Sequence, residues 1–202
     1  DSVTTSIRED QILADQFKRI IFPSNFLIKV TKLKMFFRSL FVIALICAIP
    51  SAYSYSSGAP EQACGDMIPQ HHVEPQISEA PYKLSLSSKQ LQANQNESVN
   101  IKIQGNEAGN TIKGFMLQAR VGNEPVGQFT VKSLKHAQLL DCSNGKGNAM
   151  THKKIFGNGP NSIEAVWTPP ANFKGEVKFY ATVALNGGIF WVNKLIEPCS
   201  IV

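Results

Sequence analysis

One short segment of the chain combines residue types that could bind an anionic ligand. It reads His152-Lys153-Lys154-Ile155-Phe156, and the turn-forming run Gly157-Asn158-Gly159-Pro160 follows it, so we expect a loop. Ammonium groups beside an apolar side chain suit amphiphilic anions such as lipid-A-type phosphates. We take His152, Lys153, Lys154 and Phe156 as candidate ligand-binding residues.

This segment also has a more ordinary interpretation. A solvated loop whose single aromatic side chain turns into the core would show the same residues, and this is the commoner outcome. On the binding interpretation, Lys132, Lys135 and His136 could extend the basic patch.

The four histidines raise the question of a metal site. A zinc site needs three or four converging ligands, and His71, His72 and His152 could supply them only if the fold brings distant segments together. Histidines of this kind more often bond the backbone or line a polar pocket. We therefore expect neither a bound metal nor a cofactor, and a metal-dependent redox or sequestering protein stays a minor hypothesis.

Signatures of catalysis are absent from the sequence. It contains no G-x-S-x-G elbow, no H-E-x-x-H, no C-x-x-C and no Walker lysine motif, which are the patterns that hydrolases, zinc proteases, redox enzymes and nucleotide hydrolases use. Gly145-Lys146-Gly147 resembles a phosphate loop only superficially, because no Ser or Thr follows the lysine. We expect no catalytic residues and a protein that is not an enzyme.

A segment near the N-terminus has the plan of a secretory signal peptide. Met35 and Arg38 open a short basic region, Ser39 to Ile49 form an uncharged apolar run, and small residues lead to a cleavage position after Ser54. A membrane span needs about 20 apolar residues, so we expect no transmembrane anchor. We interpret 35–54 as the signal peptide and 1–34 as an extension upstream of the natural start.

Export would lower the net charge of the mature chain and would make its glycosylation motif relevant. The net charge is +5, but residues 1–54 carry +3 of it and the remainder only +2, so bulk charge gives no argument for a nucleic-acid partner. Asn96-Glu97-Ser98 is the single N-x-[ST] motif and falls in a polar turn. In an exported chain Asn96 is a candidate glycosylation site.

Three cysteines remain after residue 54, namely Cys64, Cys142 and Cys199. An exported chain meets an oxidising compartment. One disulfide and one remaining thiol is the simplest arrangement, and the remaining thiol could stay free or pair between molecules.

The elements that must position these residues are β-strands. Apolar and polar residues alternate in several short runs, which is typical of half-buried antiparallel strands. Before them, 55–81 is rich in Pro, Ser, Gln and His without a period, and we expect an irregular arm there. The expected strands are 82–87, 99–103, Ile112–Arg120, Gln128–Lys132, Ser162–Trp167, Glu176–Ala184 and Ile189–Lys194.

Seven or more short strands in about 120 residues favour a β-sandwich. Asn186-Gly187-Gly188 reads as the hairpin turn between the last two strands. Trp167 and Trp191 lie within strand patterns and are expected to pack in the core. No sustained helical period occurs after residue 82, although Val131–Leu140 could hold a turn or two of helix.

Taken together, these residues resemble the reeler domain family. The similarity includes Cys64-Gly65-x-Met67-x-Pro69-x-His71, Gly114-Phe115-x-x-Gln118-Ala119-Arg120, Cys142, Thr151-His152, Trp167-x-x-Pro170, Gly175-x-Val177-x-Phe179-x-Ala181-Thr182-Val183 and Phe190-Trp191-Val192. On this resemblance we assign 55–202 to one reeler domain.

The resemblance implies an all-β, immunoglobulin-like antiparallel β-sandwich and a disulfide between Cys64 and Cys142. That bridge would pin the arm and draw His71 toward His152. Since it joins residues 78 apart, its loop-closure contribution is at most about 4–5 kcal/mol.

The resemblance also implies a function. Single-domain members are secreted arthropod defence proteins of the noduler and putative defence protein type, associated with bacterial recognition, haemocyte aggregation and antimicrobial defence. We therefore expect a secreted, non-enzymatic innate-immune protein whose partners are microbial surface components such as lipopolysaccharide, or the haemocyte surface. The alternative is an extracellular adhesive or matrix protein acting through protein contacts, with Cys199 available for dimerisation.

Overall fold

The computed structural model describes residues 36, 38, 57–71, 73–93 and 97–202. Contacts divide the chain into two units, Asp1–Tyr53 and Ser54–Val202. In the first unit only Phe36 and Arg38 are described, and both are helical. The 1–34 extension, the rest of the expected signal peptide and Asn96 lie outside the described residues. Over the described part of the chain, no helix is long and apolar enough to cross a membrane.

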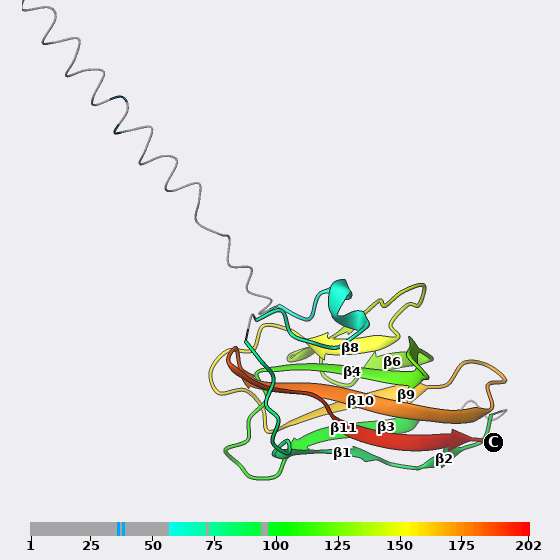
Figure 1. Cartoon of the computed structure of the whole chain (residues 1–202). Helices are drawn as coiled ribbons and strands as arrows, with labels where there is room; N and C mark the ends of the chain where they lie inside the picture. Colours follow the sequence, from blue (N-terminus) through cyan, green and yellow to red (C-terminus); the bar gives the residue numbers. More distant parts are fainter. Residues whose placement is uncertain (1–35, 37, 39–56, 72, 94–96) are drawn as a thin grey trace, which may run out of the picture. The chain divides into compact units, whose positions relative to one another are not determined.

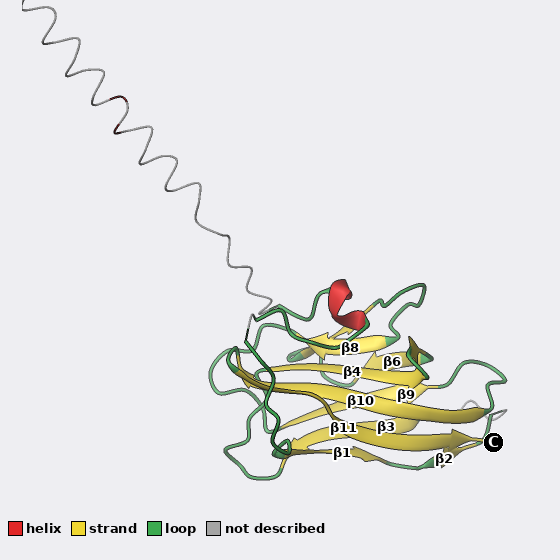
Figure 2. Ribbon diagram, viewed as in Figure 1, coloured by secondary structure: helices red, strands yellow, loops and turns green. Residues whose placement is uncertain are grey.

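The second unit is a sandwich of two β-sheets, which Figures 1 and 2 show as two layers of strands. Every pairing is antiparallel except that of β2 with β11. The first sheet has the order β1 (Tyr82–Leu86), β3 (Val99–Gly105), β9 (Ser162–Thr168), β6 (Gln128–Val131). The second has the order β2 (Gln90–Leu91), β11 (Ile189–Ile201), β10 (Gly175–Asn186), β4 (Gly114–Val121), β8 (Ala149–His152), β7 (Ala137–Leu140), with β5 (Glu124–Pro125) paired to β4.

Alternating residues of both sheets fill the space between them. In β10 the side chains of Val177, Phe179 and Val183 face this core and have no exposed surface. Trp167 of β9 is fully buried and meets the Phe179 ring edge-on at 5.1 Å between centroids. This confirms the expected sandwich and the expected core position of Trp167, and Trp191 is buried as well.

All seven expected strands are present, with changed ends. The expected hairpin also forms, since β10 and β11 pair up to Asn186 and Ile189. The helical turn considered for Val131–Leu140 is wrong, because Ala137–Leu140 form β7. The short strands β2, β5 and β8 were also not predicted.

β8 was missed because it does not alternate. Ala149, Met150 and Thr151 are all buried, since one face of the strand meets the core and the arm covers the other. A strand buried on both faces shows no period of two, and so the usual signal for a strand is lost.

Candidate functional site

The arm comprises residues 57–71 and 73–81, and 57–71 lie along the outer face of the second sheet. Its one short helical element is the 3₁₀ turn η1 (Glu61–Cys64), drawn red in Figure 2. The Ala59 amide donates to Thr151 Oγ1 at 2.8 Å, and Thr182 Oγ1 donates to the Met67 carbonyl at 3.0 Å. Beneath the arm is a second, smaller apolar cluster, formed by Ala63, Cys64, Met67, Met116, Cys142 and Ala149.

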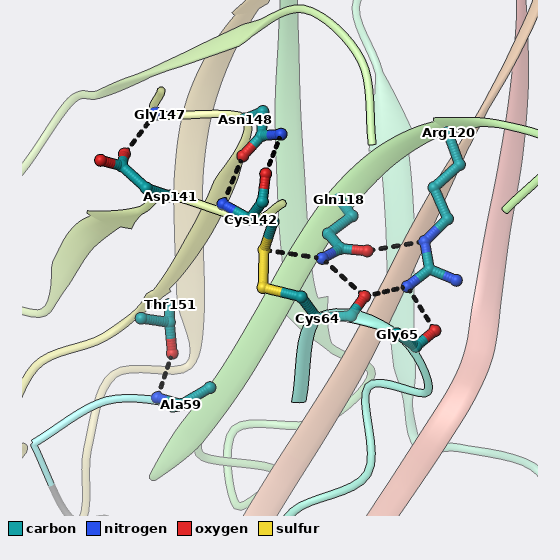
Figure 3. Close-up of a disulfide and its surroundings, with 10 residues drawn as sticks. All are labelled: Ala59, Cys64, Gly65, Gln118, Arg120, Asp141, Cys142, Gly147, Asn148 and Thr151. Carbon is teal, nitrogen blue, oxygen red and sulfur yellow. Dashed lines mark hydrogen bonds between the residues drawn. A yellow bond between two sulfur atoms is a disulfide. The ribbon is translucent and has the colours of Figure 1, made fainter. Parts of the chain in front are cut away.

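A disulfide between Cys64 and Cys142 fixes the arm to the sheet, as the resemblance implied. The two Cα atoms are 5.6 Å apart, and Figure 3 shows the bridge with its surroundings. Asn148 holds the Cys142 end, because its side chain accepts from the Cys142 amide at 2.8 Å and donates to the Cys142 carbonyl at 2.9 Å. The arm is therefore attached covalently at a well-anchored point.

A buried cation reinforces this attachment. Arg120 projects from the outer face of β4 and donates to the carbonyls of Cys64 and Gly65 at 2.7 and 3.0 Å, and to Gln118 Oε1 at 2.6 Å (Figure 3). Its guanidinium also lies 5.7 Å from the Tyr180 ring centroid. Burial lowers the pKa of Arg120, while the neighbouring Tyr180 and Asp66 act in the opposite direction.

Beside these anchors, the arm and the sheet line a partly open cavity of about 300 Å³. Its walls come from four separate stretches of the chain: the arm, the start of β4, the loop after β8 and the end of β10. The cavity exists because residues at its floor are small. Gly114 and Ala184 face each other as paired residues of β4 and β10, and neither fills the space.

The cavity lining is apolar with a cationic edge. Ala63, Met67, Met116 and Ile155 contribute apolar surface, whereas the ionisable lining residues are His71, Lys113, His152 and Lys154. No Asp or Glu is among the described residues that line it. The site therefore combines an apolar interior with the two lysines Lys113 and Lys154, and the described part of its lining holds no carboxylate.

Lys113 shapes the loop that carries Lys154. The Lys113 ammonium donates to the carbonyl of Gly157 and to that of Ile155, the latter at 3.4 Å. The Lys154 ammonium lies 5.4 Å from the centroid of the Phe156 ring. Neither Lys113 nor Lys154 forms a salt bridge with a described residue.

The four candidate ligand-binding residues occupy different positions relative to the cavity. His152, at the end of β8, and Lys154 both line the cavity, but Lys153 and Phe156 do not. Phe156 is 80% exposed, so the ordinary interpretation in which it turns into the core is wrong. His152 Nδ1 lies 3.3 Å from the Phe115 amide nitrogen, which places this ring against β4.

Of the residues that could extend the patch, His136 lies beside the loop, because its carbonyl accepts from the Lys153 amide at 2.9 Å. Burial and, to a lesser degree, the adjacent Lys135 lower the pKa of His136. Lys132 instead lies next to the first sheet, where it forms an exposed ion pair with Glu164 at 3.4 Å.

Sequence reasoning missed Lys113, Gly114 and Ala184 as parts of the site. Lys113 appeared only as one residue of an expected strand, and nothing in the spacing of two small residues 70 positions apart indicates that they face each other. His71 and His152 both line the cavity, as a pinned arm would require, whereas His72 is not described. Among the described residues, no group of three or more His, Cys, Asp or Glu could hold a metal ion.

The two packed sheets and their strand order define an immunoglobulin-like β-sandwich. The solved reeler domain of human F-spondin has this fold: it aligns with a TM-score of 0.50 and 16% identity, over 64% of this chain and 94% of that one. A family model, described as Reeler domain, matches residues 62–201. The chain belongs to the Reeler domain family.

Relatives in insects carry defence in their names. "Putative defense protein Hdd11" of Hyphantria cunea is 40% identical over 79% of this chain and 96% of its own length. "Defense protein l(2)34Fc" of Drosophila melanogaster is 39% identical over 80% of this chain and 98% of its own length. These relatives therefore match almost end to end, and they indicate a role in defence.

Proposed function

We propose that this protein is a secreted innate-immune defence protein that binds microbial envelope components, such as lipopolysaccharide, without catalysing a reaction. The observation that carries the proposal is the loop after β8. There Lys154 lines a cavity with no described carboxylate in its lining, and its ammonium lies 5.4 Å from the ring of Phe156, which is 80% exposed. The insect relatives named as defence proteins support the biological role.

The binding mechanism follows from the two kinds of group in the loop. Lys153 and Lys154 attract phosphate groups, but at physiological salt this attraction is largely screened beyond about 8 Å. Phe156 supplies apolar contact that salt does not screen, and a large exposed aromatic side chain is typical of interaction sites. His152 anchors the start of the loop against β4. The lysine charges attract the protein to the anionic envelope surface, and the apolar contact of Phe156 keeps it bound there.

The proposal includes the route of the protein to its target. The signal peptide at 35–54 would be removed after Ser54, the chain would be released without a membrane anchor, and Asn96 would carry a glycan. Promotion of haemocyte aggregation is the cellular effect that we propose for a surface able to bridge cells and microbial material.

Co-sedimentation with Gram-negative bacteria, Gram-positive bacteria and yeast at physiological salt tests the proposal, with free lipopolysaccharide as competitor. We expect saturable binding that the competitor removes. Replacing Lys153 and Lys154 together by Glu should weaken binding at least tenfold, because attraction becomes repulsion.

The matched control is the double variant Lys83→Glu with Lys174→Glu. Both lysines are exposed and form no salt bridge with a described residue, and the net charge changes by the same amount. If both double variants bind like the unmodified protein, the loop is not the site. If the unmodified protein binds none of the cells, the adhesive alternative replaces this proposal and host cells are the next partner to test.

A further inference from the structure

We propose that the cavity beneath the arm holds one acyl chain of an envelope lipid, with the phosphate of its head group bound by Lys154. This inference deepens the proposed function and rests on it for the source of the lipid. It assigns separate places to the two parts of an amphiphilic anion: the apolar chain lies between arm and sheet, and the phosphate lies at the edge.

The volume of the cavity fits a single chain. Ligand pockets start at roughly 300 Å³, so this cavity of about 300 Å³ lies at the small end. At about 30 Å³ for each water-sized group, it accommodates about ten such groups. A chain of about ten carbons matches that size.

The lining favours an apolar occupant. Met67 and Met116 come from the arm and from β4, and both side chains are almost fully buried. Methionine side chains are flexible and adapt their shape to an apolar partner. An apolar cavity does not retain ordered water without polar partners, so an acyl chain would displace little bound water on entry.

The charges at the edge favour a phosphate head group. Lys154 is exposed and forms no salt bridge with a described residue, which leaves its ammonium available to a ligand. Lys113 holds the loop carbonyls of Ile155 and Gly157 and adds a second positive charge to the same edge. An ammonium bonded to a phosphate makes a charge-assisted hydrogen bond, which is roughly twice as strong as a neutral one.

The cavity keeps its shape because the arm that lines it is fixed to the sheet at several points. The disulfide and Arg120 hold the segment around Cys64, and Thr182 holds the carbonyl of Met67. A site that is already formed loses less entropy when it binds a flexible chain.

The test measures binding of decyl phosphate by calorimetry, below its micelle concentration, to the protein produced from the full chain. Decanol and inorganic phosphate serve as the two half-ligands. We expect decyl phosphate to bind, decanol to bind at least tenfold more weakly, and inorganic phosphate to give no measurable heat. Equal binding of decyl phosphate and inorganic phosphate would overturn the proposal, because the apolar chain would then contribute nothing.

The decisive variant is Ala184→Leu, which fills the cavity floor without adding charge. We expect it to lose decyl phosphate binding at least tenfold, while Ala184→Ser, which keeps the volume, binds as before. Gly114→Val is the second filling variant: a Cβ at Gly114 would lie 3.4 Å from Ala184 Cβ and from His152 Cε1, an ordinary contact. Thermal unfolding shows which variant keeps the fold. Unchanged decyl phosphate binding in a folded filling variant overturns the proposal.

Lys154→Gln tests the head group separately. It should weaken decyl phosphate at least fivefold and leave decanol binding unchanged, since decanol carries no charge. An equal loss for both ligands would contradict the role of the Lys154 ammonium.

Co-sedimentation separates this inference from the proposed function. If decyl phosphate binding depends on Ala184 but the protein binds no bacteria, the cavity inference holds and the proposed function fails. If bacteria bind the unmodified protein and Ala184→Leu equally well, the envelope contact lies outside the cavity and the lipid source named here is wrong. Loss of both kinds of binding in Ala184→Leu supports the two proposals together.

Discussion

The role of a single residue in this protein depends on whether the fold buries or exposes its side chain. Phe156 belongs to the type of residue that usually enters a core, yet it is exposed beside Lys154. Cys199 belongs to the type that usually pairs in an exported chain, yet it is a free thiol with 1% of its surface exposed. Burial raises the pKa of the Cys199 thiol, and so both access and ionisation work against its reaction.

We predict that Cys199 does not form an intermolecular disulfide in the folded protein. At mildly alkaline pH the native protein should react with iodoacetamide at Cys199 more than a hundredfold more slowly than after denaturation, because the thiolate is the nucleophile and the raised pKa keeps the thiol protonated. Peptide mapping by mass spectrometry measures the modification site by site. Rapid labelling of the native protein, or a reducible dimer linked through Cys199, would contradict the burial that the structure shows.

At the scale of elements, β4 is the strand on which the site depends. Phe115, Leu117 and Ala119 face the core, while Met116, Gln118 and Arg120 face the arm. Seven consecutive residues of this strand are therefore buried. The polar members are tolerated because Gln118 and Arg120 satisfy each other and the carbonyls of the arm, as buried polar groups must.

We predict that Arg120→Ala loosens the arm more than it weakens the sandwich. Loss of charge-assisted bonds to the Cys64 and Gly65 carbonyls should lower the free energy of unfolding by about 2–3 kcal/mol. Urea unfolding measures this change in free energy. In hydrogen exchange, the substitution should increase the exchange rate more in 57–71 than in β10. The variant Arg120→Lys keeps the charge but not the planar guanidinium group. Its free energy of unfolding should lie between those of the unmodified protein and Arg120→Ala. Equal stability of all three proteins would mean that the arm does not depend on Arg120.

At the scale of the whole molecule, one disulfide joins a segment that has no core of its own to a sheet that has one. The arm, residues 57–71 and 73–81, contributes few large apolar side chains, and its main apolar contact is the small cluster around Met67 and Met116. Without a covalent link, the entropy gained by releasing such a segment would offset much of what these contacts contribute. The bridge removes that freedom from the unfolded chain as well.

We predict that the double variant Cys64→Ala with Cys142→Ala lowers the free energy of unfolding by about 2–5 kcal/mol and makes the arm sensitive to protease. The sandwich itself should remain folded, with the Trp167 environment unchanged in near-ultraviolet circular dichroism. Cys199→Ser is the control, since it changes a cysteine that forms no bridge. A double variant as protease-resistant as this control would show that the arm is held without the bridge.

Much of the fold could be predicted from residues that alternate. Val177, Phe179, Ala181 and Val183 indicated one buried face of a strand, and in the structure they form that face. Prediction failed at β8, where burial on both sides erases the alternation in a strand of only four residues, whereas the longer β4, also buried on both sides, was predicted. It also stopped short on β11, which extends to Ile201 beyond the expected end at Lys194.

The site was predicted only in part, for a related reason. His152 and Lys154 are neighbours in sequence, and a short basic segment with an aromatic residue can be recognised by itself. Lys113 and the Gly114–Ala184 pair cannot, because their importance comes from being opposite other residues. A small residue indicates a cavity only after its neighbours in space are known.

The sequence by itself determined seven of the strands and their packing as a β-sandwich, because a period of two and the placement of turn residues are local properties that each strand carries alone. The family resemblance added the pairing of Cys64 with Cys142. Only the tertiary structure decided that the arm covers β4, β8 and β10 and that a cavity remains beneath it. The physical reason is that a cavity is an absence of packing among four segments distant in sequence, so no local pattern of residues encodes it.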